Sequence, residues 1–358
     1  MAEPLKNLYN ETFFKSLNTA MCQAYPAFDK TKFNALIFDE NWEIKALKQR
    51  MRHITESLHQ CLPDYKQAIP ILKAASSQFS NTFTHMFFPE YAELYGLNEF
   101  DISMNALEHF TQYSSSEFAI RPFIIQDPDK TMQQMKIWAT HKNEHVRRLA
   151  SEGCRPRLPW AMQLPAFVQD PSPALEILEQ LKHDESLYVR RSVANNLNDI
   201  AKDHPQLVCD IAKSWLGFDA DTDWLVKHAC RTLLKQAHPE VLALFGFIPA
   251  EHVQVQDFKV TPKVNWRGKV TFSVTLNSNE PLGKLRLEFA IDFIKANGKT
   301  ARKVFKISES NIKETSKIIE KSFSFKPIST RKYYAGEHQL SLIINGQECA
   351  RQSFLLTL

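Results

Sequence analysis

The sequence predicts a mainly α-helical protein in which a HEAT-like α-solenoid precedes a small β-sandwich of immunoglobulin type. The first observation is a helix start, Val-Arg-Arg at 146–148, that recurs 43 positions later at 189–191. The second is that the Asp-Pro turns at 127–128 and 170–171 share this spacing of 43 positions. A period of about 40–47 residues is typical of paired-helix HEAT arrays, which stack into curved solenoids. The third is a change to alternating apolar and polar residues after residue 250.

The first 110 residues predict a set of helices. Apolar side chains recur three or four positions apart from residue 5 to about residue 75, for example at Leu47, Met51 and Ile54. An aromatic-rich stretch over 79–88 leads into another helix, which Gly96 is suited to end because glycine is common just after helix C-termini. A further helix is expected to begin near residue 101.

Residues 115–245 hold the repeats. One copy spans 127–153 and the next begins at residue 170, and each contains an Asp-Pro turn, a helix and a second helix that starts with Val-Arg-Arg. A weaker third copy begins at Trp224, where Val226 follows Val189 by 37 positions, so this copy is shortened. The segment 117–121 has the pattern of a degenerate fourth start.

The last part of the chain predicts strands. Half-buried strands are expected at 260–266, 269–276, 284–289 and 339–344. Asn-Gly pairs at 297–298 and 345–346 are favoured hairpin turns. About 100 residues of short strands fit a small immunoglobulin-like sandwich. We therefore expect two domains, a HEAT-like repeat domain over 1–250 and a β-sandwich over 251–358.

The composition argues against several classes of protein. No apolar run is long enough to span a membrane and the N-terminus lacks a signal sequence, so we expect a cytoplasmic protein with no membrane partner. None of the six cysteines forms a C-x-x-C pair, and no H-E-x-x-H, Walker A or G-x-G-x-x-G motif is present. No metal and no cofactor is therefore expected.

The charge is distributed unevenly. The net charge is +4, but the residues after 250 carry 18 basic and 10 acidic side chains, whereas the first 250 carry 26 and 30. The larger part must therefore gather its arginines locally if it is to bind a polyanion such as DNA. The basic C-terminal part is expected to add DNA contacts.

The repeated arginines are the first candidate ligands for phosphate. Arg148 and Arg191 are equivalent in the two repeats, and Arg147 and Arg190 are their neighbours. Arginine forks match phosphate geometry, and the arginine of each pair nearer the concave face is the better ligand. The alternative is a salt-bridged repeat surface, because many repeat arrays carry Val-Arg at this spot for packing between repeats.

A tight loop with two arginines, two prolines and a tryptophan follows the first Val-Arg-Arg helix. Arg155 and Arg157 suit phosphate, and an exposed Trp160 could stack on a base or sugar. Prolines fix such a loop and reduce its ordering cost on binding. The alternative is a rigid linker between repeats in which Trp160 fills the core.

Three carboxylates, Glu117, Glu152 and Asp199, lie inside or beside the arginine-bearing helices. A carboxylate next to a phosphate-binding surface is unfavourable unless it meets a cation. The oxocarbenium ion formed when a glycosidic bond breaks is such a cation. The alternative is internal salt bridging to Arg121, Arg148 or Arg191.

These residues lie in stretches that closely resemble the AlkC family of bacterial DNA alkylation repair glycosylases, relatives of the AlkD family with HEAT-like repeats. The stretches are 116–123, 147–162 and 188–205, within a likeness that covers roughly residues 5–245, and the C-terminal sandwich resembles the immunoglobulin-like extension of part of the family. The resemblance implies a monofunctional glycosylase of base excision repair. It implies excision of cationic alkylated bases, chiefly 3-methyladenine and 3-methylcytosine, from double-stranded DNA without base flipping, by a bacterial protein found on the nucleoid when bound.

The resemblance also assigns roles by motif position. Glu117, Glu152 and Asp199 would face the damaged nucleotide, Trp160 would pack on its sugar, and Arg148 would hold the backbone. We expect a monomer, because a solenoid with its own groove needs no partner. The other arginines expected to contact DNA are Arg121, Arg147, Arg155, Arg157, Arg190 and Arg191.

The alternative to an enzyme is a non-catalytic HEAT-repeat scaffold that binds DNA or a protein through the same surface. Substitution of the carboxylates discriminates the two hypotheses. A scaffold would tolerate Glu117→Ala or Asp199→Ala with only a change in stability, whereas a glycosylase would lose turnover and retain DNA binding.

Overall fold

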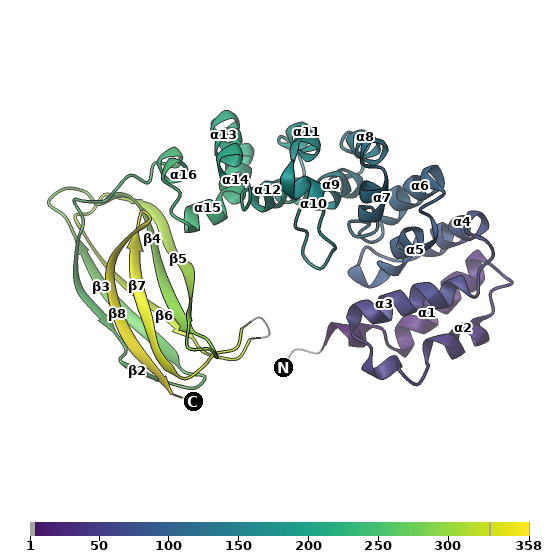
Figure 1. Ribbon diagram of the computed structural model, residues 1–358, viewed down its shortest axis with the longest axis horizontal. Coiled ribbons are helices and arrows are strands. Elements are labelled where there is room, and N and C mark those ends of the chain that lie inside the picture. Colours follow the sequence, from purple (N-terminus) through teal and green to yellow (C-terminus); the bar gives the residue numbers. More distant parts are fainter. Residues whose placement is uncertain (1–3, 329–330, 358) are drawn as a thin grey trace. The chain divides into compact units, whose positions relative to one another are not determined.

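The computed structural model describes residues 4–328 and 331–357 and divides the chain into two compact units (Figure 1). The helical unit comprises Met1–Val208 and Ser214–Ala229, and the C-terminal unit comprises Cys209–Lys213 and Cys230–Leu358. No helix in the described part of the chain is both long and apolar enough to cross a membrane.

The helical unit is built from consecutive helices, with the middle of α13 assigned to the other unit. They are α1 (Glu11–Ala24), α2 (Lys30–Ile37), α3 (Leu47–His59), α4 (Tyr65–Ser76), α5 (Phe87–Tyr95), α6 (Phe100–Phe110), α7 (Arg121–Gln126), α8 (Pro128–Trp138), α9 (Glu144–Gly153), α10 (Pro165–Gln169), α11 (Ser172–Leu181), α12 (Leu187–Ile200), α13 (Pro205–Trp215) and α14 (Ala220–Ala229). Gly96 is the C-cap of α5, as predicted. The helical repeat-like region predicted from the sequence is confirmed.

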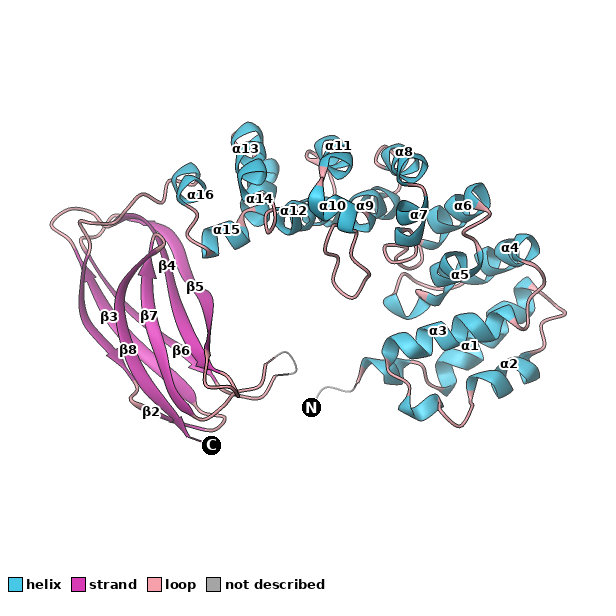
Figure 2. Ribbon diagram, viewed as in Figure 1, coloured by secondary structure: helices cyan, strands magenta, loops and turns pink. Residues whose placement is uncertain are grey.

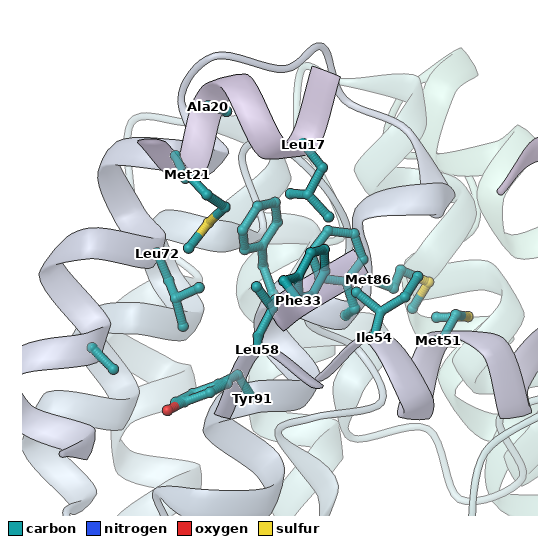
Figure 3. Packing of buried hydrophobic residues seen from close by; sticks show 14 of the residues in the cluster. Leu17, Ala20, Met21, Phe33, Met51, Ile54, Leu58, Leu72, Met86 and Tyr91 are labelled. Atoms are coloured by element: carbon teal, nitrogen blue, oxygen red, sulfur yellow. The ribbon is translucent and has the colours of Figure 1, made fainter. Parts of the chain in front are cut away.

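The first helices enclose an apolar core. Leu17 of α1, Phe33 of α2 and Leu58 of α3 are fully buried and point toward one another in Figure 3. Such side chains stabilise a fold by about 1.5–3 kcal/mol each relative to exposure. The apolar spacing of three and four residues in the sequence therefore marks the faces that α1 and α3 bury here.

The 43-residue repeat corresponds to two helix pairs, α8 with α9 and α11 with α12 (Figure 1). Asp127 caps α8 by accepting a hydrogen bond from the backbone N–H of Lys130, and Asp170 accepts one from the N–H of Ser172 at the start of α11. The second helices, α9 and α12, pack against each other. The shortened third copy lies in α14, which ends at Ala229.

From Cys230 on, the described residues of the C-terminal unit form two short helices and two β-sheets (Figure 2). The sheet orders are β1-β3-β6 and β2-β8-β7-β4-β5, and among the described residues only the β2–β8 pair is parallel. Facing aromatic residues such as Phe272 and Phe289, whose ring centroids lie 5.2 Å apart, fill the space between the sheets. The elements are α15 (Arg231–Lys235), α16 (Pro239–Leu244), β1 (Gln254–Val260), β2 (Lys263–Asn265), β3 (Lys269–Asn277), β4 (Gly283–Ile294), β5 (Thr300–Ile312), β6 (Ser316–Ser324), β7 (Gly336–Ile344) and β8 (Gln347–Thr357).

The Asn345-Gly346 pair forms the two-residue turn between β7 and β8 that its sequence predicts. Both residues have positive φ, 47° and 84°, which asparagine and glycine tolerate best. The side chain of Asn345 also donates to the carbonyl of Ile248 (2.7 Å), which ties the chain after α16 to the sandwich. The strands begin at Gln254, close to the expected boundary at 250, but α15 and α16 group with the strands.

Candidate active site

The three candidate carboxylates belong to one chain of alternating charges in the helical unit. We call it the charge chain, and its members in order are Glu117, Arg148, Glu152, Arg155, Asp199 and Lys202. Helix α9 places Arg148 and Glu152 on one face because they are four residues apart. Asp199 and Lys202 come from the C-terminal part of α12, and Glu117 comes from the segment before α7.

Glu117 forms the partly open end of the charge chain. Its Oε2 accepts hydrogen bonds from Arg148 Nη1 (2.5 Å) and Ser115 Oγ (2.6 Å). In the described part of the chain no hydrogen bond reaches its Oε1, and the side chain is 15% exposed. Glu117 is therefore held in place by one oxygen and has the other available for an outside donor.

Glu152 and Asp199 are held more completely. Arg155 joins them, with Nη1 2.5 Å from Glu152 Oε1 and Nε 2.8 Å from Asp199 Oδ2. Ser192 Oγ donates to Glu152 Oε2, and Lys202 Nζ to Asp199 Oδ1. Because both oxygens of each carboxylate are engaged and both side chains are buried, these two groups supply fixed negative charge.

Arg148 lies between its partners, with 16% of its side chain exposed. Burial opposes its positive charge, but Glu152 and Glu117 outweigh that effect and raise the pKa of the guanidinium above its usual value. The guanidinium also lies over the ring of Tyr188, 4.9 Å from the centroid. Burial in turn raises the pKa of Tyr188. Arg148 therefore remains a cation between Glu117 and Glu152.

Trp160 projects from the loop between α9 and α10. It is 68% exposed, so the alternative in which it fills the core is wrong. Its backbone is in the left-handed region, with φ 66°, which is strained for a residue other than glycine. Lys48 of α3 donates to its carbonyl oxygen (2.8 Å) and lies 5.1 Å from the ring centroid of Phe118. Lys48 thus links the Trp160 loop to the residue that follows Glu117.

Arg121 organises this loop from inside. Its side chain is fully buried and donates to the carbonyl oxygens of Gly153, Arg155 and Met162, each at 2.8 Å. Burial lowers its pKa to about 10, which leaves it charged at neutral pH. The expectation that Arg121 contacts DNA is therefore corrected, because a side chain with no exposed surface cannot reach a phosphate.

The first arginine of each Val-Arg-Arg motif joins consecutive repeats. Arg147 donates to the carbonyls of His141 and Lys142 and pairs with Asp184 at 2.6 Å. Arg190 makes the equivalent bonds 43 residues later, to the carbonyls at 184 and 185, and pairs with Asp221 at 2.9 Å. We correct the expectation of phosphate contacts for both, because their side chains are only 11% and 6% exposed and most of their donors are already engaged.

The second arginines and Arg157 remain candidate phosphate ligands. Arg191 is exposed, lies 6.0 Å from the ring centroid of Trp224, and makes no ion pair within the residues that the structure describes. Arg157 pairs with Asp203 at 2.7 Å, and this hydrogen bond raises its pKa. Arg155, by contrast, points into the charge chain and is 7% exposed. It positions carboxylates, which leaves little of it for phosphate.

Sequence reasoning missed three side chains that complete the site. Ser115 and Ser192 each donate to a candidate carboxylate, and Lys48 contacts the Trp160 loop from far away in the sequence. Single serines at unremarkable positions give no signal. No cluster of metal-ligating side chains occurs among residues 4–328 and 331–357.

Both units of the chain are similar to known proteins. A family model described as DNA alkylation repair enzyme matches residues 114–233, and one described as the C-terminal Ig-like domain of Uncharacterised protein YhaZ matches residues 254–358. The chain is 49% identical over 346 residues to Uncharacterized protein YhaZ of Bacillus subtilis (strain 168), with 96% of each chain covered.

A solved structure matches almost the whole chain. It is that of the Pseudomonas fluorescens alkylpurine DNA glycosylase AlkC bound to DNA containing an abasic site analog. The identity is 37%, the TM-score is 0.95, and the match covers 99% of this chain and 100% of that chain. With helical repeats followed by an immunoglobulin-like domain and a relative of this identity over its whole length, the chain belongs to the AlkC family of DNA alkylation repair proteins.

Proposed function

We propose that the protein is a monofunctional DNA glycosylase of base excision repair that hydrolyses the N-glycosidic bond of cationic alkylated bases. The expected substrates are 3-methyladenine and 3-methylcytosine in double-stranded DNA. The observation that carries the proposal is the unpaired Oε1 of Glu117 at the partly open end of a buried chain of charges. The similar AlkC structure holds DNA with an abasic site analog, and an abasic site is what base excision leaves.

The chemistry needs little more than this arrangement supplies. In a base alkylated at N3 the ring is already a cation, so the glycosidic bond is weak. When the bond breaks, its electron pair goes to the base, which leaves neutral, and the positive charge moves to the sugar. Fixed carboxylates stabilise such an oxocarbenium ion electrostatically. A water oxygen then binds C1′ of the sugar and loses its proton to a base.

The contacts favour different roles for the three carboxylates. Glu117 has a free oxygen and is the better candidate to orient the water and accept its proton. Glu152 and Asp199 are fully engaged and contribute fixed charge. The charge chain has three carboxylates and three cations, so its net field is small. We infer that Glu117 carries most of the catalytic effect because its charge is the one facing outward.

The neighbouring residues support binding without base flipping. Trp160 is exposed and held in a fixed strained backbone, so it is suited to pack on a sugar rather than to fill a pocket. Arg148 would hold the backbone beside the lesion, with Arg157 and Arg191 as further phosphate contacts. The basic C-terminal unit is proposed as an accessory DNA-binding domain, and the protein as a monomer in the bacterial cytoplasm.

The test is single-turnover release of 3-methyladenine from methylated duplex DNA by the wild type and Glu117→Gln. The glutamine keeps the shape and removes the charge and the base, so we expect a loss of about 100-fold or more in rate with DNA binding retained. Glu185→Gln is the matched control, because Glu185 is 89% exposed and lies outside the charge chain.

A second candidate function is a non-catalytic scaffold. The internal pairing of all three carboxylates favours it, because such pairs also occur purely for packing. Tight DNA binding by the wild type with no release of base would establish this alternative. Equal rates for the wild type and Glu117→Gln would show that the catalytic role lies elsewhere.

A further inference from the structure

A cavity of about 430 Å³ lies beside the candidate active site, between α3, α5 and the Trp160 loop. Its volume falls in the range of about 300–1,000 Å³ that is usual for small-molecule pockets. Ser115 and Met162 are among the residues that line it. Ser115 also donates to Glu117, and Met162 lies two residues after Trp160. The cavity therefore borders a residue that contacts Glu117 and the loop that carries Trp160, where the proposed function has the glycosidic bond break.

The walls suit a flat heterocycle. Met51, Met86 and Phe118 supply apolar surface, and methionine and aromatic side chains both pack well against planar rings. None of these three residues belongs to the charge chain. The cavity is thus a separate space that the proposed hydrolysis leaves unexplained.

The polar groups of the cavity are balanced in charge. Three carboxylates and three cations line it, namely Glu56, Glu90, Glu93, Lys45, Lys48 and Arg52. A cavity without net charge offers no general attraction for a cation. It offers both donors and acceptors to a neutral ring that carries amino groups and ring nitrogens.

Of these carboxylates Glu56 is exposed to solvent, and one of the two partly buried ones lacks a hydrogen-bond donor within the described residues. Both oxygens of Glu90 are engaged, by Arg52 Nε at 2.9 Å and Thr55 Oγ1 at 3.1 Å. Glu93, 16% exposed, has only an ion-pair contact with Arg52 at 3.7 Å and, in the described residues, accepts no hydrogen bond. A partly buried carboxyl without a donor is costly, and an exocyclic amine would supply the missing donor.

We propose that this cavity binds the excised nucleobase after cleavage, with the ring against Met86 and Phe118 and its amino group on Glu93. The inference rests on the proposed glycosylase function. It identifies a product subsite for a neutral amino-bearing base. It also gives the released base a place to go without requiring it to enter the cavity while attached to DNA.

Burial and the neighbouring Glu90 raise the pKa of Glu93 to about 7. The carboxyl is therefore poised between acceptor and donor forms near neutral pH, so it can match either an amino group or a ring nitrogen of the ligand. This adaptability fits a site for more than one base.

The experiment measures binding of free 3-methyladenine to the full-length protein by titration calorimetry, and inhibition of multiple turnovers by the same added base. We expect saturable binding and competitive inhibition for the wild type. Glu93→Gln should weaken both by about tenfold, because the amide oxygen accepts a weaker hydrogen bond than the carboxylate does. Glu11→Gln, whose carboxylate is 87% exposed on α1, should match the wild type.

The outcomes separate this inference from the proposed function. No base release by the wild type would refute the glycosylase. Normal release with no binding or inhibition by free base would overturn the product subsite alone, as would equal binding by the wild type and Glu93→Gln. If Glu93→Gln slowed the first turnover while free base failed to bind, the base would enter while attached to DNA, and the proposal would be wrong.

Discussion

Replacement of Arg155 by methionine tests whether the buried centre of the charge chain behaves as the geometry implies. Arg155 is the only residue that joins Glu152 and Asp199 in the described part of the chain, and all three side chains are nearly buried. Methionine keeps most of the volume and removes the cation. We expect the protein to lose much of its stability and the carboxylates of Glu152 and Asp199 to change position.

The expected loss of unfolding free energy depends on the partners that Glu152 and Asp199 keep after Arg155 is replaced. Removing one partner of a buried ion pair costs about 3–5 kcal/mol, because an unpaired charge is left in a poor solvent. Glu152 would keep Ser192 and a 3.5 Å contact with Arg148, and Asp199 would keep Lys202. Because of this partial compensation we expect the loss of unfolding free energy to lie near the lower end of that 3–5 kcal/mol range, at about 3 kcal/mol.

Arg157→Met provides a matched control two residues away. Arg157 also pairs with an aspartate, Asp203, at 2.7 Å, but both side chains are substantially exposed. Exposed pairs contribute little because water solvates the separated charges. Urea denaturation of both variants gives the comparison directly. Similar losses for the two variants, or no loss for Arg155→Met, would refute the argument that burial makes Arg155 the centre of the site.

Three further predictions concern other parts of the molecule. The pKa of Glu93 is raised from 4.5 to about 7, so the folded protein binds this proton more tightly than the unfolded chain does. The contribution of Glu93 to the unfolding free energy should therefore be complete below about pH 4.5 and should fall by about 3 kcal/mol as the pH rises through 7. In urea titrations Glu93→Gln should flatten this fall, and an unchanged profile would contradict the prediction. Lys48→Met removes the donor to the Trp160 carbonyl and should slow single-turnover cleavage by about 10- to 100-fold. The control Lys66→Met loses only a pair with Glu99 and should cleave at the wild-type rate. Equal rates for the wild type and Lys48→Met would show that Lys48 does not position the loop. Glutamine at both Lys259 and Lys321, which flank an open cavity on the β1-β3-β6 sheet, should reduce the slope of log affinity against log salt by up to about 0.9 for each lysine that contacts phosphate. A slope that does not change would argue against DNA contacts at this cavity.

The helical part of the fold was well predicted because its signals are periodic. Two landmarks with a shared spacing of 43 identified the helix pairs, and the C-cap glycine after α5 was found from its type. The strands were predicted less completely. The expected strand at 260–266 contains β2 (Lys263–Asn265) and only the last residue of β1, and β1, β5, β6 and β8 were missed.

The missed strands β1, β5, β6 and β8 leave most of their side chains exposed or half-buried, so few apolar positions mark them in the sequence. Strand β4 was predicted too short, at 284–289 instead of Gly283–Ile294, for a different reason. Charged side chains of β4 are buried, for example Glu288, which pairs with Arg286, and Asp292, which is paired by Arg302 of β5. Ion pairs across the sheet therefore bury residues that a period-2 reading counts as exposed. Alternation fails as a signal wherever polar side chains cover one another in this way.

The members of the candidate site could be proposed from the sequence, whereas their contacts could not, and their catalytic roles stay predictions. The sequence identified the three carboxylates and Trp160, but it could not tell which arginines face outward. Arg121, Arg147 and Arg190 are structural, because their donors are used on backbone carbonyls that only the folded chain brings together. Burial of a long side chain is decided by its neighbours, and those come from distant segments.

The joint made by the first arginine of each repeat has a consequence for how the array keeps register. Arg147 and Arg190 each donate to an equivalent pair of carbonyls in their own repeat. Each also pairs with an aspartate of the next repeat, Asp184 or Asp221. The interval between repeats is 43 residues from Val146 to Val189 but 37 residues from Val189 to Val226, yet both joints pair an arginine with an aspartate. Length can therefore vary inside a repeat while the arginine–aspartate joint between repeats is kept. Loop insertions away from these joints should leave the spacing of the phosphate contacts intact.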